Sequence, residues 1–398
     1  MTDNMKNNAK EIRRLFLLDD QISFLNFGSF GACPKAVFED LIKWQQLLEK
    51  EPVRYIVEYG PKFLEESKRA LGNYIGADPS DLIFVPNPTF AVNILAKTLL
   101  HKDDEVLTTD LEYGAMDYTW EYHCEKAGAR YIRQHISLPL QSKEQFIEEF
   151  WKGCTPKTRI VFISQITSST GLIFPVEEIC AEAKRRGLIT IVDGAHVPGH
   201  VPLDLQHLKA DFYTGACHKW MMAPKGCSFL YAGKEFQDDL DPLIISWGYK
   251  SVNPHASKFQ EYHQFNGTRD FSAYLCIPAT LHFRKELQWD SLLEKCRTSV
   301  LKKGAELSDF LGTKPLAPLH EEFYGQLYSA EIETLYPEEL QRMLFTNYAI
   351  EIPVMRHGDR CYIRFSFQPF NLEEEIDELI SALEEIQTTT DLWTKANA

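Results

Sequence analysis

The sequence predicts an α/β protein with a large domain, built on a mostly parallel seven-stranded sheet, and a smaller α+β domain. From about residue 80 to 232, short runs rich in β-branched and aromatic residues alternate with stretches of helical periodicity. After about residue 272 helices come first, and short strands follow only later. A chain of 398 residues is also long enough for a second domain.

Seven runs in the first region have the composition of strands. They span Leu82–Val85, Glu105–Thr108, Arg130–Arg133, Arg159–Ser164, Ile189–Asp193, Phe212–Thr214 and Ser228–Tyr231. Between them we expect a helix that begins after Pro175 and ends at Gly187, and another, carrying Met116 and Trp120, that ends before Gly128. Alternation of this kind predicts a parallel sheet covered on both faces, with ligands bound beyond the carboxyl ends of the strands.

The predicted large domain spans residues 28–271, and the small domain combines residues 1–27 with residues 272–398. In the small domain, short strands are expected around Ile350–Val354 and Tyr362–Phe367. A final helix is expected to begin at Asn371, because Glu374 three residues later resembles a capping box.

Composition argues against several classes of protein. The net charge is −15 and no long block of Lys or Arg is present, which disfavours a nucleic-acid partner. No apolar run approaches the roughly 20 residues that span a bilayer, and the N-terminal stretch lacks the apolar core of a secretory signal. Nine cysteines stand singly without a CxxC pair, so we expect reduced thiols and a cytoplasmic location.

Three of the predicted strands are followed by segments with binding potential. Asn87–Asn93, after the first strand, offers a hydroxyl and free backbone N–H groups for a phosphate, or serves as a plain helix cap. Tyr113, after the second strand, either stacks on a planar ring or packs in the core. The hydroxyl-rich segment Thr167–Gly171 either donates to a phenolate oxygen or is an ordinary polar turn.

The fifth strand runs directly into an acid, Asp193. A carboxylate at the end of a buried strand requires a partner, and a pyridinium N–H would meet that need while making the ring a better electron sink. The alternative is a structural cap on the next turn. Nearby, His196 and His200 are separated by Pro198 and cannot share one helix face, so we expect no metal site.

The sixth strand is followed by Lys219, which lies between His218 and Trp220. A partly desolvated amine has a lowered pKa and can attack an aldehyde. Most lysines are surface charges, so the residue alone would not support this interpretation. The order of these residues along the chain and their positions after strands favour it.

Together these segments resemble a known family. The series NPTFAVN, LEYGA, TSSTG, DGAH, HKW with APKG, GTRD at Gly267–Asp270 and RFS at Arg364–Ser366 is similar to the class V aminotransferase superfamily of fold-type I pyridoxal 5'-phosphate (PLP) enzymes. Within it, the chain most resembles the isopenicillin N epimerase-like branch. The resemblance extends from FLNFGSFGACP at Phe24–Pro34 to RFSFQPFN at Arg364–Asn371.

The resemblance implies PLP as the cofactor and assigns roles to residues. Lys219 matches the lysine that bonds to the cofactor aldehyde, and Asp193 matches the partner of the ring nitrogen; these two are the predicted catalytic residues. Thr268 matches a residue lent to the partner subunit's phosphate site, which implies a homodimer with shared active sites. Residues that match other cofactor-contacting positions are Thr89, Phe90, Tyr113, Ser168 (or Ser169), His196, Thr214 and His218.

The substrate side is implied in the same way. Arg364 matches the arginine that binds the α-carboxylate of an amino-acid substrate, with Asn26 and Phe27 as further substrate-binding residues. One position departs from the pattern, because Ala216 stands where many relatives carry a polar residue. Thr214 or water is expected to replace that part of the phosphate contact.

The implied reaction begins with removal of the α-proton from an amino acid or amino-acid-containing compound. Epimerisation or racemisation is the leading expectation, with Tyr113 as a candidate second acid; β-elimination by a carbon–sulfur lyase and transamination are the alternatives. Desulfuration through a protein persulfide is disfavoured, because residues 321–360 contain no cysteine and Cys361 is expected within a strand. DGAH also resembles kynureninases, which the rest of the chain fits less well. A non-catalytic scaffold would be expected to lack Lys219 or Asp193.

Overall fold

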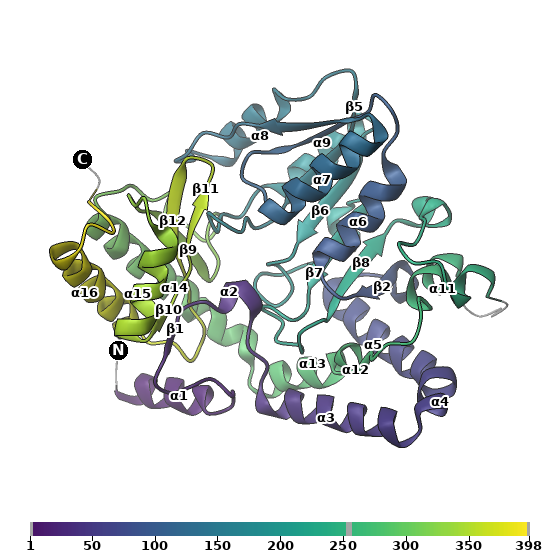
Figure 1. Ribbon diagram of the computed structural model, residues 1–398, viewed down its shortest axis with the longest axis horizontal. Coiled ribbons are helices and arrows are strands. Elements are labelled where there is room, and N and C mark those ends of the chain that lie inside the picture. Colours follow the sequence, from purple (N-terminus) through teal and green to yellow (C-terminus); the bar gives the residue numbers. More distant parts are fainter. Residues whose placement is uncertain (1–2, 252–256, 396–398) are drawn as a thin grey trace.

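The computed structural model describes residues 3–251 and 257–395, and its centre is a seven-stranded sheet with the strand order β2-β8-β7-β6-β5-β3-β4 (Figure 1). Four adjacent pairs are parallel, whereas β8 runs antiparallel to both of its neighbours. All seven predicted strands are confirmed. Their bounds are β2 Leu82–Val85, β3 Glu105–Thr109, β4 Arg130–Gln134, β5 Thr158–Ser164, β6 Ile189–Gly194, β7 Phe212–Ala216 and β8 Ser228–Ala232.

Helices cover both faces of this sheet, because successive side chains of each strand point to opposite sides. Ile83 packs with α6 and α7 residues in one core cluster, while its neighbours Leu82 and Phe84 belong to the other cluster, with α5 and α9 residues. The helices of this part of the chain are α5 Gly60–Ile75, α6 Pro88–Leu99, α7 Gly114–Ala127, α8 Lys143–Trp151, α9 Val176–Arg185, α10 Leu205–Leu208 and α11 Lys258–Gln264. The predicted ends of α7 and α9 are confirmed by left-handed glycines at Gly128 and Gly187.

A group of helices lies below the sheet in Figure 1. In this group α12 and α13 contact α3, and α13 also contacts α5. The predicted domain boundary at residue 272 therefore falls just before helices that pack on the N-terminal part of the large domain, and the boundary itself remains a prediction. The bounds are α3 Lys35–Lys50, α4 Pro52–Arg54, the π-helix η1 Tyr55–Tyr59, α12 Ser272–Leu275 and α13 Ile277–Glu286.

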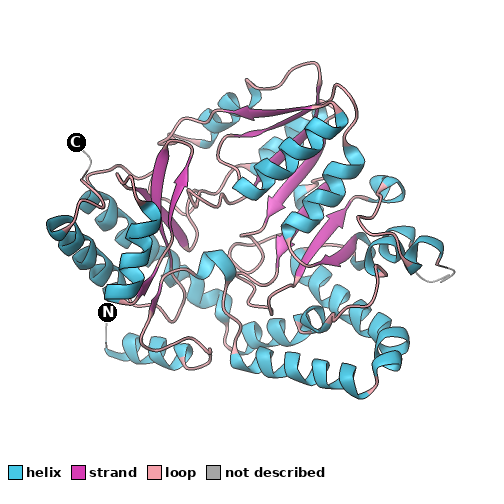
Figure 2. Cartoon of the chain, viewed as in Figure 1, coloured by secondary structure: helices cyan, strands magenta, loops and turns pink. Residues whose placement is uncertain are grey.

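The C-terminal part is a three-stranded antiparallel sheet, of order β11-β12-β9, packed with helices (Figure 2). The N-terminal segment joins it, because β1 (Ser23–Phe24) pairs in parallel with β10 (Ile350–Glu351). The other elements here are α1 Asp3–Arg13, α2 Phe27–Phe30, α14 Trp289–Leu311, α15 Pro337–Tyr348, α16 Glu373–Thr389, β9 Leu327–Glu331, β11 Val354–His357 and β12 Arg360–Ser366.

The predicted start of the final helix is wrong by two residues. Helix α16 begins at Glu373, and the acid that completes its capping box is Glu375 rather than Glu374. The backbone N–H of Leu372 donates to Glu375 Oε2 at 2.8 Å, and Asn371 Nδ2 donates to the same atom at 2.9 Å. Asn371 thus positions the Glu375 side chain, which accepts the free N–H of Leu372. The remaining 3₁₀ turns are η2 Pro79–Asp81, η3 Lys234–Asp239 and η4 Trp247–Lys250.

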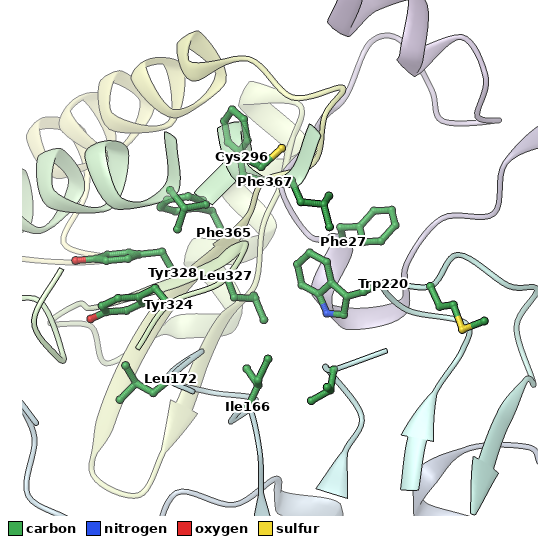
Figure 3. Close-up of a cluster of buried hydrophobic side chains, with 14 of the residues drawn as sticks. Phe27, Ile166, Leu172, Trp220, Cys296, Tyr324, Leu327, Tyr328, Phe365 and Phe367 are labelled. Carbon is green, nitrogen blue, oxygen red and sulfur yellow. The ribbon is translucent and has the colours of Figure 1, made fainter. Parts of the chain in front are cut away.

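A shared hydrophobic core joins the small sheet to the loop that follows β7 (Figure 3). Trp220 of that loop packs on Phe27 of α2 with ring centroids 5.6 Å apart, and Leu327 of β9 lies close by. The loop between Ala216 and Ser228 is therefore packed against the C-terminal part of the structure. No helix of the described residues is long and apolar enough to cross a membrane.

Candidate active site

A cavity of about 460 Å³ lies where the carboxyl ends of β5, β6 and β7 meet α2 and β12. Its walls bring together side chains that are far apart in the sequence, including Asp193, Lys219 and Arg364. A volume of this size is typical of small-molecule sites. The position also matches the general rule that open α/β sheets bind ligands beyond the carboxyl ends of their strands.

Lys219 presents its amine to this cavity. Burial lowers the pKa of Lys219 from 10.5 to about 8, and the positive charge of Arg364 adds to this effect, while Asp193 opposes it. At pH 7 roughly a tenth of the Lys219 side chains are therefore unprotonated, and this fraction, which is the form that attacks an aldehyde, reaches about half near pH 8.

The tautomer of His196 supports a neutral amine at Lys219. Trp220 Nε1, which can only donate, lies 3.2 Å from His196 Nδ1, so Nδ1 accepts. Burial holds the pKa of His196 well below 6.5, so the neutral ring carries its proton on Nε2. Because Nε2 lies 3.2 Å from Lys219 Nζ, the N–H donates and the lysine nitrogen accepts through its lone pair.

Asp193 supplies the buried acid of the cavity. One oxygen, Oδ1, accepts the backbone N–H of Ala195 at 2.9 Å. Burial raises the pKa of Asp193, whereas that N–H and the charge of Lys219 lower it. Oδ2 has no hydrogen-bond partner among the described residues, so it is free to bind a positively charged N–H.

Arg364 is a guanidinium without an acid. It is 2% exposed and forms no ion pair with any described residue, and its Nε has no hydrogen-bond partner there. Its other nitrogens donate to neutral oxygens, those of Ser168 and, at 3.0 Å, Ser29 Oγ. Burial lowers the pKa of Arg364 to about 10, so the side chain stays charged at neutral pH. An uncompensated buried cation of this kind is a binding site for a carboxylate.

The predicted substrate residues near the N-terminus, Asn26 and Phe27, do not line the cavity. Asn26 Oδ1 accepts the hydroxyl proton of Ser29 at 2.5 Å, and Ser29 in turn accepts from Arg364. Asn26 therefore orients Ser29, which lines the cavity where Asn26 does not. Phe27 is fully buried against Trp220 and also lies outside the cavity wall.

The predicted phosphate residues divide into two groups. Thr89 and His218 line the cavity, at the start of α6 and beside Lys219. Phe90 does not line the cavity. Its backbone N–H donates to Asn87 Oδ1 at 2.8 Å, which caps helix α6. Thr214 is fully buried and its hydroxyl donates to the carbonyl of Phe229, so it does not replace the polar group that Ala216 lacks.

Tyr113 and Ser168 also line the cavity, whereas Thr268 does not. Thr268 lies instead in a separate cavity of about 720 Å³ between η1, α5, residues 246–247 and residues 260–271. No group of three or more potential metal ligands occurs among the described residues. His200 in particular is occupied, since its ring stacks on Trp220 and both of its nitrogens bond to backbone groups.

Sequence reasoning did not identify three residues of this region. Ser29, Ser164 and Lys225 line the cavity, and Lys225 Nζ also donates to the carbonyl of Gly31 at 2.9 Å. A fourth, Glu112, is buried behind Ser164. The apolar context of Glu112 in the motif LEYGA was an available signal, but no local pattern indicates the contact between Ser29 and Arg364.

Comparison with known proteins defines the class. The sequence profile described as "Aminotransferase class-V" matches residues 33–379, and the chain belongs to this family. It is similar to the isopenicillin N epimerase of Amycolatopsis lactamdurans, with 32% identity over 93% of this chain and 96% of that protein. The isopenicillin N epimerase of Streptomyces clavuligerus is also 32% identical, over 94% of this chain and 97% of that protein.

More distant relatives have other activities. A putative L-cysteine desulfhydrase of Oryza sativa is 26% identical over 92% of this chain and 83% of that protein. Among solved structures, the cystine C–S lyase C-DES in complex with cysteine persulfide has a TM-score of 0.79 at 22% identity, covering 92% of this chain and 97% of that one. This likeness shows the fold.

Family membership confirms the predicted enzyme class, with PLP as its cofactor. The residues of the cavity fit that group: an unprotonated amine for the aldehyde, a buried acid with a free oxygen for the ring nitrogen, and the N-terminus of α6 with Thr89 for the phosphate. Arg364 remains as a charged group of the cavity without an ion-pair partner among the described residues.

Proposed function

We propose that this enzyme removes the α-proton of an amino acid or amino-acid-containing compound and epimerises or racemises it, as the isopenicillin N epimerases at 32% identity suggest. The observation that carries the proposal is the buried, unpaired guanidinium of Arg364 in the same cavity as the amine of Lys219. The guanidinium selects a carboxylate, and the amine is placed for chemistry on the neighbouring carbon.

When bound, PLP would supply an aldehyde for the substrate amine and an electron-withdrawing ring for the α-carbon. Asp193 would hold a proton on the ring nitrogen through its free Oδ2. Arg364 would fix the α-carboxylate, and Ser29 and Ser168 keep the guanidinium in place. Lys219 Nζ would take the α-proton, and the Nε2–H of His196 would hold the amine in the cavity until its lone pair turns to the substrate.

Inversion requires a second acid, for which Tyr113 is the candidate. Its side chain lines the cavity and is 48% exposed. Burial lowers the pKa of Arg364, and the interaction with Tyr113 raises it. Tyr113 therefore lies near the carboxylate-binding group. The carbon that must receive a proton is adjacent to that carboxylate.

A carbon–sulfur lyase is the second candidate, supported by the L-cysteine desulfhydrases among the relatives. β-Elimination needs only one base, so Lys219 would suffice. A protein persulfide is disfavoured in either case, because the cavity wall contains no cysteine among the described residues. Cys361 lies within β12, where its thiol contacts the carbonyl of Thr334. Transamination remains the third possible outcome.

Reaction in deuterated water distinguishes these outcomes. Incubation with candidate amino acids and peptides should place deuterium on an α-carbon of inverted configuration. Release of pyruvate and ammonia would instead identify a lyase, and a keto acid an aminotransferase. Tyr113→Phe should remove inversion but retain washout of the α-proton, whereas Tyr118→Phe, an exposed tyrosine of α7, is the matched control.

We also propose a cytoplasmic homodimer that shares its active sites. The nine cysteines are free, as expected for a reducing compartment. Thr268 lies outside the cavity of its own chain, consistent with a role in the partner's. Mixing Lys219→Ala chains with Thr268→Val chains should regenerate one intact site per mixed dimer; no recovery of tight PLP binding would contradict sharing.

A further inference from the structure

Two buried glutamates flank strand β3, one at its start and one shortly after its end, and they differ in their charged partners. Glu105, at its start, is 0% exposed and pairs with Arg130 and with the hydroxyl of Thr155. Glu112, just past its end, is also 0% exposed but forms no ion pair with any described residue. Glu112 is therefore a buried acid without a cation, which is costly if it is ionised.

The groups around Glu112 connect it to the cavity. Oε1 is 2.8 Å from the hydroxyl of Thr109, and Oε2 contacts both the backbone N–H and the hydroxyl of Ser164. Ser164 lines the cavity, and across the β5–β6 pair it is the direct neighbour of Asp193. Asp193 thus lies in the cavity wall and Glu112 lies behind it, with Ser164 next to both carboxyl groups.

We propose that Glu112 is a positioning residue that acts through Ser164 and Asp193: it holds a proton at neutral pH, so that the negative charge of the pair stays on Asp193. The assignment of the charge to Asp193 follows from its partners. Asp193 has the N–H of Ala195 and, whenever Lys219 is protonated, the positive charge of that side chain, whereas Glu112 has only neutral donors. The functional part of this inference rests on the proposed role of Asp193 toward the ring nitrogen of PLP.

The proton has a defined position. On Oε2 it would be donated to the hydroxyl oxygen of Ser164, while Oε2 still accepts the serine N–H. The hydroxyl hydrogen of Ser164 is then released toward the cavity that this serine lines. An ionised Glu112 would instead retain both donors of Ser164 and add a second negative charge beside Asp193.

Other titratable groups near Glu112 act in the same direction. Burial is the largest cause that raises the pKa of Glu112, to about 8, and the negative charges of Asp193 and Asp117 contribute. Asp117 of α7 is itself bonded to Tyr131 and Arg133 of β4. Glu105 shows the contrast, because Thr155 and Arg130 lower its pKa despite its burial.

The first test measures unfolding of the apoprotein against pH for the wild type, Glu112→Gln and the matched control Glu105→Gln. Glu112 keeps its proton in the folded chain and loses it in the unfolded chain between pH 4.5 and about 8. The stability of Glu112→Gln relative to the wild type should therefore rise about tenfold in equilibrium constant per pH unit across that window. Glu105→Gln should change relative to the wild type only below its ordinary pKa of 4.5.

A flat relative stability of Glu112→Gln from pH 5 to 8 would overturn the proposal. If that variant does not fold, the infrared carbonyl band of a protonated carboxylic acid in the wild type takes its place. The band should be present at pH 7 and disappear with a midpoint near 8; its absence at pH 7 would be equally decisive.

The second test follows the visible absorbance of the PLP-loaded enzyme against pH. Spectra of Glu112→Gln and the wild type should coincide below pH 8 and diverge above it, where only the wild type gains a charge beside Asp193. If the two sets of spectra coincided at every pH, the proposed effect of Glu112 on Asp193 would be contradicted. Failure of the wild type to bind PLP would refute the proposed function, and the apoprotein measurement would still decide the protonation of Glu112.

Discussion

At the scale of single residues, several buried titratable groups in and behind the cavity lack a partner of opposite charge. Arg364 lacks an acid, Glu112 lacks a cation, and Lys219 is only partly protonated at neutral pH. Each would be unfavourable in an ordinary protein core. Strongly shifted pKa values that gather in one cavity are typical of active sites, where a bound cofactor or substrate provides the missing opposite charge.

The pH dependence of PLP capture should report the amine of Lys219. Only the neutral amine attacks an aldehyde, so the capture rate of the apoenzyme should rise with pH and reach half its maximum near pH 8. Arg364→Met should move this midpoint upward, because the charge of Arg364 lowers the pKa of Lys219. Stopped-flow absorbance measures the rate. Arg356→Met, an exposed position on β11, should leave the midpoint unchanged.

Arg364→Gln should weaken substrate binding but not PLP binding. Loss of charge-assisted hydrogen bonds to a carboxylate costs about 1.5–3 kcal/mol, so KM should rise roughly 10- to 100-fold. An amine that lacks the carboxylate should bind the wild type and the variant equally. Steady-state kinetics and PLP titration provide the comparison, and an unchanged KM would remove Arg364 from the substrate site.

At the scale of elements, the strands could be predicted from the sequence because their signals are local. Apolar runs and the turns after them identified all seven strands and placed Asp193, Tyr113 and Lys219 at one edge of the sheet. The contact between Ser29 and Arg364 could not be predicted, since it joins residues 335 positions apart. The direction of Thr214 was equally inaccessible, because it depends on how β7 pairs with β8.

The turn after α2 should be sensitive to substitution. Gly31 has φ of +64°, and a Cβ there would lie 2.7 Å from the carbonyl oxygen of Lys219. Gly31→Ala should destabilise the protein by more than the roughly 1 kcal/mol of a left-handed alanine, and should loosen PLP. Gly358→Ala is the control, with φ of +60° and open space around it. Thermal melts should show the larger loss at Gly31; equal losses would mean that the contact is readily relieved.

At the scale of the whole molecule, the small sheet of β9, β11 and β12 makes three contacts with the loop that follows β5. Arg364 donates to the carbonyl of Ser168, Ser329 donates to that of Ser169, and His357 contacts the Ser169 hydroxyl at 3.2 Å. His357 also reaches the carbonyl of Asp110 at 2.7 Å. Since Ser168 lines the cavity, the position of the small sheet determines the shape of the substrate end.

Removal of one of these contacts should therefore affect substrate more than cofactor. His357→Ala deletes two hydrogen bonds between the small sheet and the large domain, and we expect KM to rise several-fold with PLP affinity unchanged. His282→Ala, on the exposed face of α13, should change neither quantity. A parallel loss of PLP affinity in His357→Ala would show that the two ends of the cavity are not separable.

The pairing of β1 with β10 has a consequence for biosynthesis. The first strand to leave the ribosome, Ser23–Phe24, must wait for Ile350–Glu351 before it has a neighbour. Ser29 follows directly after β1 and meets Arg364, which is translated later still. The central sheet, complete by Ala232, can assemble while synthesis continues. The nascent chain can therefore place Lys219 and Asp193 first. The proposed carboxylate site around Arg364 can form only as translation ends.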